Sequence, residues 1–135
     1  MTVAVAELME RKVRTVRSEA TVAEAIAELA DAHISGMPVV DGAGRMIGVL
    51  STTDLLTAEA ETNDASARNT LWKHTPVREL MTPRPFTVAP DEDVREAARQ
   101  MLYAEVHRLF VAEGDQVIGV LSTTDIVRAV ATGRL

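Results

Sequence analysis

Apolar positions along this chain follow a helix period and then a strand period, and the same succession occurs twice. Residues 22–30 carry apolar side chains at i, i+3, i+4, i+7 and i+8, which form one face of a helix, and residues 94–102 repeat that stripe. Thr21 with Glu24 has the spacing of a capping box, and Asp93 takes the cap position before the second stripe. The helix faces expected to be buried are Val22, Ala25, Ile26, Leu29 and Ala30 in the first copy and Val94, Ala97, Ala98, Met101 and Leu102 in the second.

Two short apolar runs follow each of these helices and predict β-hairpins. The runs are residues 37–40 and 46–50 in the first copy and residues 109–112 and 117–121 in the second, each pair separated by a turn that contains glycine. A final helix is expected to begin in or just after the Ser-Thr-Thr-Asp that ends each hairpin. With a short strand at the Thr-Val that precedes each first helix, each copy reads strand, helix, strand, strand, helix.

The two copies are an internal duplication. Three pairs of matching segments establish it: residues 5–9 with 77–81, 15–16 with 87–88, and 48–54 with 119–125, where the last pair has the identical sequence Gly-Val-Leu-Ser-Thr-Thr-Asp. We therefore expect a first repeat over residues 1–56, a polar, Ala-rich connector over residues 57–75, and a second repeat over residues 76–135. A unit of roughly 60 residues buries too little surface to be comfortably stable alone. The two repeats are thus expected to pack about a pseudo-twofold axis as one intertwined pair.

Length and composition narrow the classes of function. With 135 residues and 47% apolar residues, the chain can bury a core, and its net charge of -6 argues against sequence-independent binding of nucleic acid. It has no cysteine, which excludes disulfides, thiolate metal sites and thiol catalysis. No apolar run approaches the ~18 residues that span a bilayer, and no signal peptide is recognisable. We therefore expect a cytoplasmic protein without a membrane partner.

A basic run lies beside the first predicted strand. Its four cations, within seven residues, are Arg11, Lys12, Arg14 and Arg17. Such a run is typical of a solvated face. The alternative is that it receives the polyphosphate tail of a ligand, in which case Arg14 and Arg17 are the candidates because they flank Thr15-Val16.

The repeated Ser-Thr-Thr-Asp admits two interpretations. Ser51 with Asp54, and Ser122 with Asp125, have the spacing of a helix start, where the hydroxyl accepts a backbone N–H and the carboxylate suits the helix dipole. The same groups also resemble those that hold ribose hydroxyls in dinucleotide folds. The glycine that opens each string allows either a ligand or the opposite strand to come close. The spacing alone favours neither interpretation.

Taken together, these features resemble a cystathionine β-synthase (CBS) domain pair, also called a Bateman module. The resemblance rests on the leading Thr-Val pairs, on the hairpin sequences at residues 36–41 and 107–111, and on the closing Ser-Thr-Thr-Asp, and it covers nearly the whole chain. It implies an α/β (α+β) fold of tandem β-α-β-β-α repeats with clefts between them. It also implies a regulatory, non-catalytic module that binds AMP, ADP, ATP or S-adenosylmethionine as a regulatory ligand, with no other cofactor.

The resemblance further implies which residues bind the ligand. Ribose is expected at Ser51 with Asp54 and at Ser122 with Asp125. Adenine is expected beside Thr15, Val16, Met37 and Pro38 in the first repeat and beside Thr87, Val88 and Leu109 in the second. His107 and Arg108 resemble a His-Arg pair that contacts phosphate in nucleotide-sensing members, whereas the first repeat has Ser35 and Gly36 at these positions. Because Gly36 offers only its backbone, the two clefts are expected to differ in phosphate affinity.

Two other classes of function stay open. One is an interaction module that dimerises without a ligand, and the other is a small hydrolase or transferase acting on a nucleotide. Neither Ser51 nor Ser122 sits in G-x-S-x-G, and the three histidines lack the spacing of metal ligands. We therefore identify no catalytic and no metal-binding residue. The expected partners are an adenosyl small molecule, a second copy in a homodimer, and an effector protein of unknown identity.

Overall fold

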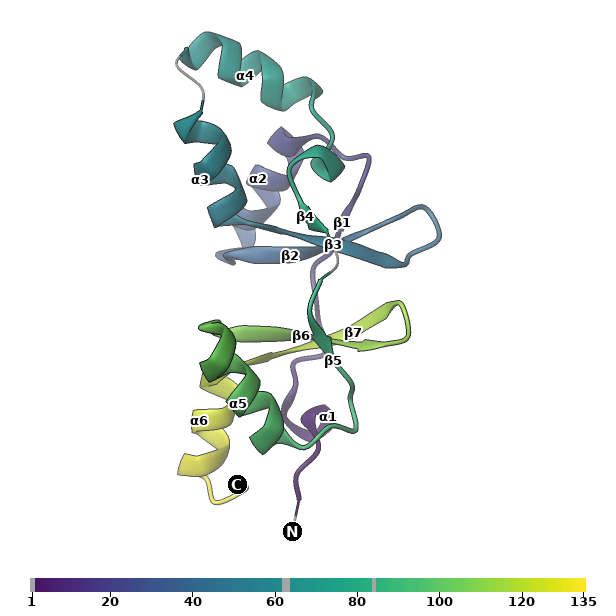
Figure 1. The fold of residues 1–135 in the computed structure, drawn as a ribbon, viewed down its shortest axis with the longest axis vertical. Coiled ribbons are helices and arrows are strands. Elements are labelled where there is room, and N and C mark those ends of the chain that lie inside the picture. The colour runs from purple at the N-terminus through teal and green to yellow at the C-terminus, as the bar shows by residue number, and fades with distance from the viewer. Residues whose placement is uncertain (1, 62–63, 84) are drawn as a thin grey trace. The chain divides into compact units, whose positions relative to one another are not determined.

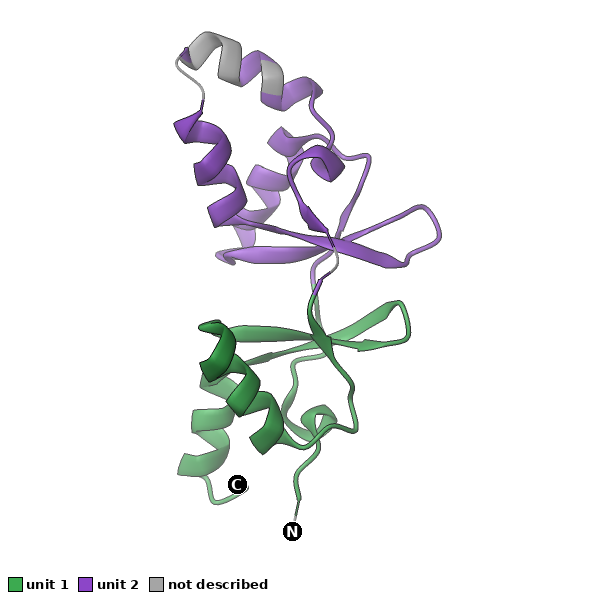
Figure 2. Ribbon diagram, viewed as in Figure 1, with its two compact units in different colours: residues 1–13, 86–135 green, residues 14–85 purple. Residues whose placement is uncertain are grey.

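The computed structural model describes residues 2–61, 64–83 and 85–135, and for residues 65–68 and 71 it describes the backbone alone. The chain forms two compact units, shown in Figure 2. Unit 1 combines Met1–Val13 with Phe86–Leu135, and unit 2 consists of Arg14–Pro85. None of the helices in these described ranges is both long enough and apolar enough to cross a membrane.

Unit 2 is a four-stranded sheet with helices on it (Figure 1). The sheet order is β1-β2-β3-β4, in which β1 runs parallel to β2 and the remaining neighbours are antiparallel. The elements are β1 (Val16–Arg17), α2 (Val22–Ala32), β2 (Gly36–Val40), β3 (Met46–Ser51), α3 (Thr52–Ala60), α4 (Ala65–His74), the 3-10 helix η1 (Val77–Glu79) and β4 (Thr82–Pro83).

Unit 1 repeats this arrangement with a three-stranded sheet. Its order is β5-β6-β7, in which β5 is parallel to β6 and β6 is antiparallel to β7. The elements are α1 (Val5–Leu8), β5 (Thr87–Val88), α5 (Val94–Ala104), β6 (Arg108–Glu113), β7 (Gln116–Ser122) and α6 (Thr123–Ala131). The predicted order of strand, helix, strand, strand, helix is thus confirmed in both units. The segment expected as a connector, residues 57–75, contains the end of α3 and the whole of α4.

Each unit has its own apolar core, and the helices bury a narrower stripe than the sequence predicted. Val94, Ala97 and Met101 of α5 are buried, whereas Leu102 is 80% exposed. Ala30 of α2 is exposed in the same way. The predicted burial of Ala30 and Leu102 is therefore wrong, because the sheet covers the positions i, i+3 and i+7 of each helix and position i+8 turns away from it.

The opening segments of the two repeats are exchanged between the units. The segment 5–9 lies in unit 1, where Val5 and Met9 join the core formed by the second repeat. The matching segment 77–81 lies in unit 2, where the N–H of Val77 donates to the carbonyl oxygen of Ala20 at 2.8 Å. Each core is consequently completed by a stretch of chain from the other repeat.

The glycine that opens each Gly-Val-Leu-Ser-Thr-Thr-Asp string lies against one of these exchanged segments. A Cβ on Gly48 would stand 2.8 Å from the carbonyl oxygen of Thr82, and a Cβ on Gly119 would stand 3.1 Å from that of Glu10. In both cases a methionine sulfur is nearer still. Of the two neighbours that the sequence allowed, a ligand or a strand, the structure has the strand.

Gly48→Ala should lower the free energy of unfolding by about 1–3 kcal/mol, because the new methyl group overpacks a contact with backbone that cannot move aside. Urea denaturation measures this difference. Gly36→Ala is the matched control, since its Cβ would meet its nearest atom at an ordinary 3.5 Å. Equal losses in the two variants would contradict the close approach as the reason for Gly48.

Glu92 joins α1 to the start of α5 and carries a half-buried carboxylate. Its backbone carbonyl accepts the N–H of Val5 at 2.8 Å, and its Oε2 atom has no hydrogen-bond partner among the described residues. Burial raises the pKa of the Glu92 carboxyl, and the negative charges of Glu96 and Asp91 raise it further. The ionised form of this side chain therefore destabilises the folded state.

Glu92→Gln should make the protein more stable at pH 7 and flatten its pH dependence. The unfolded state releases the Glu92 proton at the ordinary glutamate pKa and the folded state only at a higher pH, so stability falls as pH rises between the two. Urea denaturation across that range measures the slope. The exposed Asp115, in the turn between β6 and β7, provides the control Asp115→Asn, which should keep the wild-type slope. An unchanged slope in Glu92→Gln would refute the assignment.

Candidate functional site

Each unit has a helix start at the end of its hairpin, held by a reciprocal pair of hydrogen bonds. In unit 2 the Ser51 N–H donates to Asp54 Oδ2 at 2.9 Å, and the Asp54 N–H donates to Ser51 Oγ at 3.2 Å. In unit 1 the Ser122 N–H donates to Asp125 Oδ2 at 2.8 Å, and the Asp125 N–H donates to Ser122 Oγ at 3.1 Å. The capping interpretation of the repeated string is thus confirmed in both copies.

The second carboxylate oxygen distinguishes the two helix starts. Asp54 Oδ1 accepts the hydroxyl of Thr82 at 2.9 Å, so both oxygens of that carboxylate are used inside unit 2. Asp125 Oδ1 lies 3.7 Å from a guanidinium nitrogen of Arg128, and no hydrogen bond from a described residue reaches it. With its side chain 17% exposed, Asp125 keeps one acceptor oxygen that another molecule can use.

Sequence reasoning missed Thr82. A signal existed, because Thr82 lies 72 residues after Glu10, and the duplication therefore places a hydroxyl in one unit where the other has a carboxylate. The Glu10 carboxylate accepts the N–H of Lys12 at 3.0 Å. A duplicated motif can thus hold identical residues while a neighbour outside the motif changes what they can bind.

In unit 1 an arginine is paired across the hairpin with the residue that caps the start of α6. The register of the hairpin pairs Arg108 with Ser122, and the equivalent pair in unit 2 is Gly36 with Ser51. Arg108 is half-buried and forms no ion pair with any described residue. A guanidinium next to a helix N-terminus favours an anionic group, since both carry positive charge.

The backbone at the α6 start is partly occupied. The Thr123 N–H donates to the carbonyl oxygen of His107 at 2.9 Å, and the N–H of Asp125 is taken by Ser122. Of the first three amide groups of the helix, the one on Thr124 is left without a partner among the described residues. His107 itself is exposed. One N–H, one carboxylate oxygen and one guanidinium therefore surround this helix start.

The residues expected beside adenine lie in or next to the cores of their own units. Val16 and Met37 belong to the core of unit 2, and Val88 and Leu109 belong to that of unit 1. Pro38 is buried as well, so these positions can present backbone groups to a ligand more readily than side chains. The two threonines are more accessible: Thr15 is exposed and Thr87 is half-buried.

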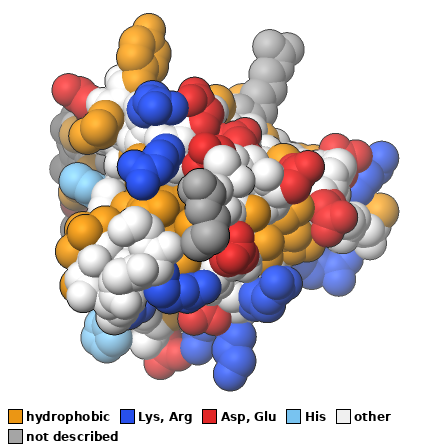
Figure 3. Space-filling model, turned by 90° about the horizontal axis from the view of Figure 1, so that it is seen from below, with side chains coloured by type: hydrophobic (Ala, Val, Ile, Leu, Met, Phe, Trp, Pro, Cys, Tyr) orange, Lys and Arg blue, Asp and Glu red, His pale blue; other side chains and the backbone are white. Residues whose placement is uncertain are grey.

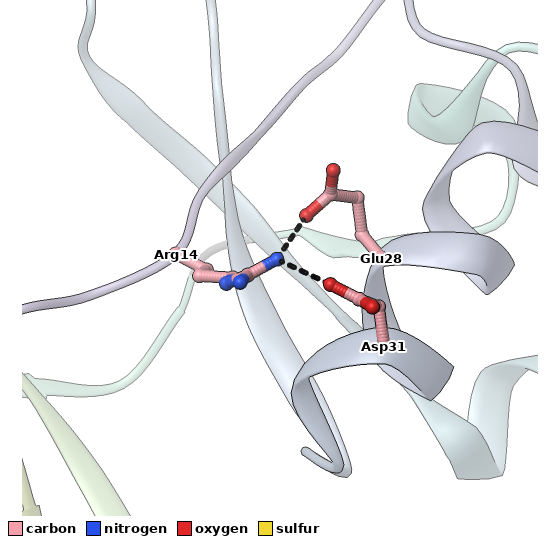
Figure 4. Close-up of polar contacts among 3 residues, drawn as sticks. All are labelled: Arg14, Glu28 and Asp31. Carbon is pink, nitrogen blue, oxygen red and sulfur yellow. Dashed lines mark hydrogen bonds and ion pairs between the residues drawn. The ribbon is translucent and has the colours of Figure 1, made fainter.

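The basic run is only partly available for a ligand. Figure 4 shows Arg14 between two carboxylates of α2: its Nη1 atom lies 2.9 Å from Glu28 and 3.5 Å from Asp31. These pairs are at least half exposed, so each adds at most about 1 kcal/mol. Arg17, in contrast, forms no ion pair with a described residue. For Arg14, the solvated-face interpretation is favoured.

The described residues contain no cluster of three histidine, aspartate or glutamate side chains that could hold a metal ion. Beside the Ser51 and Ser122 hydroxyls, the hydrogen bonds of the described residues involve the capping carboxylates and their backbone, and no histidine. The arrangement can therefore bind a diol and an anion, and the Ser51 hydroxyl itself donates to the capping carboxylate of Asp54 at 3.0 Å.

Comparison with known proteins gives a consistent result. Residues 5–61 and 77–132 each match the CBS domain. The curated protein CBSX1 of Arabidopsis thaliana, a chloroplastic CBS domain-containing protein, is 28% identical over 93% of this chain and 63% of its own length. The chain spans 59% of the related CBSX2. It is thus about three fifths of the length of these two relatives.

Solved structures resemble the chain over almost its full length. CBSX2 in complex with AMP has a TM-score of 0.82 and 27% identity, covering 98% of both chains. The CBS domain pair of MJ0100, in complex with 5-methylthioadenosine and S-adenosyl-L-methionine, has a TM-score of 0.79 at 22% identity, covering 98% of this chain and 99% of its own. These likenesses confirm the predicted fold class.

Asp54→Ala should destabilise the protein more than Asp125→Ala, although the two residues occupy matching positions. Both changes remove the carboxylate half of a capping box, which costs about 0.5–2 kcal/mol, and Asp54→Ala also leaves the Thr82 hydroxyl without its acceptor, at a further cost of about 1 kcal/mol. Urea denaturation without nucleotide measures both. If Asp125→Ala lowers the free energy of unfolding as much or more, the Asp125 carboxylate makes a stabilising contact besides those with Ser122 and Arg128.

Proposed function

Because the chain belongs to the CBS domain family, we propose that it is a regulatory, non-catalytic module that binds an adenosine-containing ligand and reports it to another protein. The observation that carries the proposal is the α6 start, where Asp125 Oδ1 accepts no hydrogen bond from a described residue and Arg108 pairs with Ser122 across the hairpin. AMP bound to CBSX2 supports an adenosyl ligand. The candidates are AMP, ADP, ATP and S-adenosylmethionine.

At the α6 start, different residues would bind different parts of the ligand. Asp125 Oδ1 accepts a ribose hydroxyl, and the Thr124 N–H donates to an oxygen of the ligand. Arg108, helped by the exposed His107, binds a phosphate as a fixed, charged donor. In unit 1, adenine lies against the backbone near Thr87-Val88 and Leu109. The matching residues in unit 2 are Thr15-Val16, Met37 and Pro38.

The two helix starts are proposed to differ in what they accept. At Ser51 a ribose must displace the Thr82 hydroxyl from Asp54, and Gly36 contributes no charge. At Ser122 no hydroxyl of a described residue donates to Asp125 Oδ1, which has only the 3.7 Å ion pair with Arg128, and Arg108 contributes a charge. We therefore expect the α6 start to bind a phosphorylated ligand more tightly than the α3 start does.

The proposed module binds its ligand without converting it. A diol acceptor and a phosphate-binding cation hold a ligand. The Asp54 carboxylate that accepts the Ser51 hydroxyl is already engaged by the helix start and by Thr82, and no histidine among the described residues hydrogen-bonds to either serine. The homodimer, the effector protein and the cytoplasmic location remain predictions alongside it. The competing function is an interaction module without ligand, and turnover of a bound nucleotide would instead indicate an enzyme.

A thermal-shift panel with AMP, ADP, ATP, S-adenosylmethionine and adenosine tests the proposal. A ligand at ~100 times its dissociation constant should add roughly 2.7 kcal/mol to the stability of the folded state, which raises the melting temperature. No shift with any of these compounds would favour the interaction module. Chromatography of the incubated compound checks for turnover.

Arg108→Ala should weaken AMP binding by roughly 10-fold or more and leave adenosine binding nearly unchanged, because it removes a charged hydrogen bond to phosphate alone. Isothermal titration measures both ligands. Arg95→Ala is the matched control, since Arg95 of α5 is exposed and likewise forms no ion pair with a described residue. Equal loss of AMP and adenosine in Arg108→Ala would contradict a phosphate contact.

A further inference from the structure

The segment 3–9 is anchored on unit 1 at Glu92, and the matching segment of unit 2 is anchored at Ala20. The Val5 N–H donates to the carbonyl oxygen of Glu92 at 2.8 Å, and the Val77 N–H donates to that of Ala20 at the same distance. The two bonds are equivalent, because the donors lie 72 residues apart and so do the acceptors. The anchoring residue therefore carries a carboxyl group in unit 1 and a methyl group in unit 2.

Two side-chain oxygens beside the anchor in unit 1 are buried and have no hydrogen-bond partner among the described residues. They are Glu92 Oε2 and Gln100 Oε1. Gln100 lies about two turns further along α5, and a hydrogen bond from its side chain acts on the Glu92 carboxyl. A buried acceptor without a donor costs free energy. One proton on Glu92 Oε2 would satisfy both atoms, since the acid O–H donates and the amide carbonyl of Gln100 accepts.

The charges around the Glu92 carboxyl favour this proton. Burial raises the pKa of Glu92, the negative charges of Glu96 and Asp91 raise it further, and the hydrogen bond from Gln100 lowers it. The nearest cation on that side of α5, Arg99, is already paired with Glu96 at 2.8 Å. No described residue forms an ion pair with Glu92.

The other charged groups on the elements that meet at Glu92 are engaged elsewhere. The Glu7 carboxylate of α1 accepts a backbone N–H of its own segment at 2.7 Å, and the Asp93 carboxylate accepts the Arg95 N–H at 2.9 Å. Arg134 donates to the carbonyl oxygen of Glu7 at 3.2 Å. In the view of Figure 3, acidic and basic side chains are interspersed over the surface. The partly buried Glu92 carboxyl has no such neighbour of opposite charge among the described residues.

In unit 2 the corresponding groove holds a carboxylate that is neutralised by a cation. The position of Gln100 is taken by Glu28, whose carboxylate lies 2.9 Å from Arg14 (Figure 4). The position of Arg14 is taken in unit 1 by Phe86, which lines a groove with Gln100. Unit 1 thus has an aromatic ring where unit 2 has a guanidinium, so a proton is the positive charge that its carboxyl group can take up.

We propose that Glu92 and Gln100 form a proton-controlled latch that holds the segment 3–9 on unit 1. In the closed latch the Glu92 O–H donates to the Gln100 carbonyl oxygen, and the Glu92 backbone keeps the position in which it accepts the Val5 N–H. When the proton leaves for solvent, the ionised carboxylate and the Gln100 carbonyl oxygen oppose each other in a buried place. The carboxylate then turns towards water, and the anchor of the segment is weakened.

Acid closes the latch and a rise in pH opens it. Once the segment is released, Glu92 binds its proton with the ordinary glutamate pKa, whereas in the anchored state it keeps the proton to a higher pH. The anchor is therefore strongest below the first value and weakens as pH rises through the second. The chain passes between the two units after Val13 and again after Pro85, so the latch sets how firmly the first of these connections is held. It requires no nucleotide, and its test is separate from the thermal-shift panel.

Amide hydrogen exchange, followed by NMR from about pH 4 to about pH 7 without nucleotide, tests the latch. Val5 and Ala6 donate to backbone oxygens at the anchor of unit 1, and Val77 and Arg78 are the equivalent donors in unit 2. The protection factors of the first pair, divided by those of the second pair, should fall about 5-fold or more over this range. A ratio that stays constant with pH would overturn the proposal.

Glu92→Gln should keep the latch closed at every pH, because its amide N–H replaces the acid O–H as the donor to Gln100. The ratio of protection factors should then keep its acidic value up to about pH 7. Val77 and Arg78, measured in the same sample, report whether unit 2 is folded. Wild-type pH dependence in this variant would show that another group controls the anchor.

Gln100→Met should leave the latch open at every pH, because methionine has a similar length and no carbonyl oxygen to accept the Glu92 proton. The ratio at about pH 4 should fall about 5-fold or more, towards the wild-type value at neutral pH. Gln116→Met is the matched control, since Gln116 of β7 is exposed and lies in the same unit. A Gln100→Met variant that keeps the acidic protection of Val5 would refute the role of the amide.

Discussion

A helix that follows directly on a buried strand must satisfy its first amide groups without help from a preceding turn. Here a serine and an aspartate three residues apart do so reciprocally, once in each unit. The bond fixes where α3 and α6 leave the sheet, and it uses only one of the two carboxylate oxygens. Only the polar groups that these capping hydrogen bonds leave unused can bind a ligand at a helix start.

The polar groups left unused at the helix start differ between the units, because residues outside the repeated string differ. Thr82 uses the second oxygen of Asp54, while Arg108 adds a cation beside Ser122. The grooves between the first strand and the first helix differ too. Arg14 forms ion pairs with α2 in unit 2, whereas the matching residue Phe86 lines a groove with Gln100 and Tyr103 of α5 in unit 1. The duplication has therefore kept one scaffold and produced two chemically distinct surfaces.

Much of this architecture could be predicted from the sequence, because local periods and the duplication support one another. The hairpins, the capped helices and both helix starts follow from patterns that each extend over about 14 residues or fewer. The third contact at Asp54 could not be predicted, since Thr82 is 28 residues away and reaches it only after β4 joins the sheet. The exposure of Leu102 was missed for a related reason: an apolar stripe does not reveal how much of its width the sheet will cover.

Because the opening segments are exchanged, each repeat needs the other to complete its apolar core. A second repeat alone would lack Val3, Val5 and Met9, three residues of its own core, and would present the resulting gap to water. The first repeat would in turn lack Val77 and Met81. A chain cut between the repeats is therefore expected to yield two fragments that each expose apolar surface, and to regain its fold only when both fragments are present together.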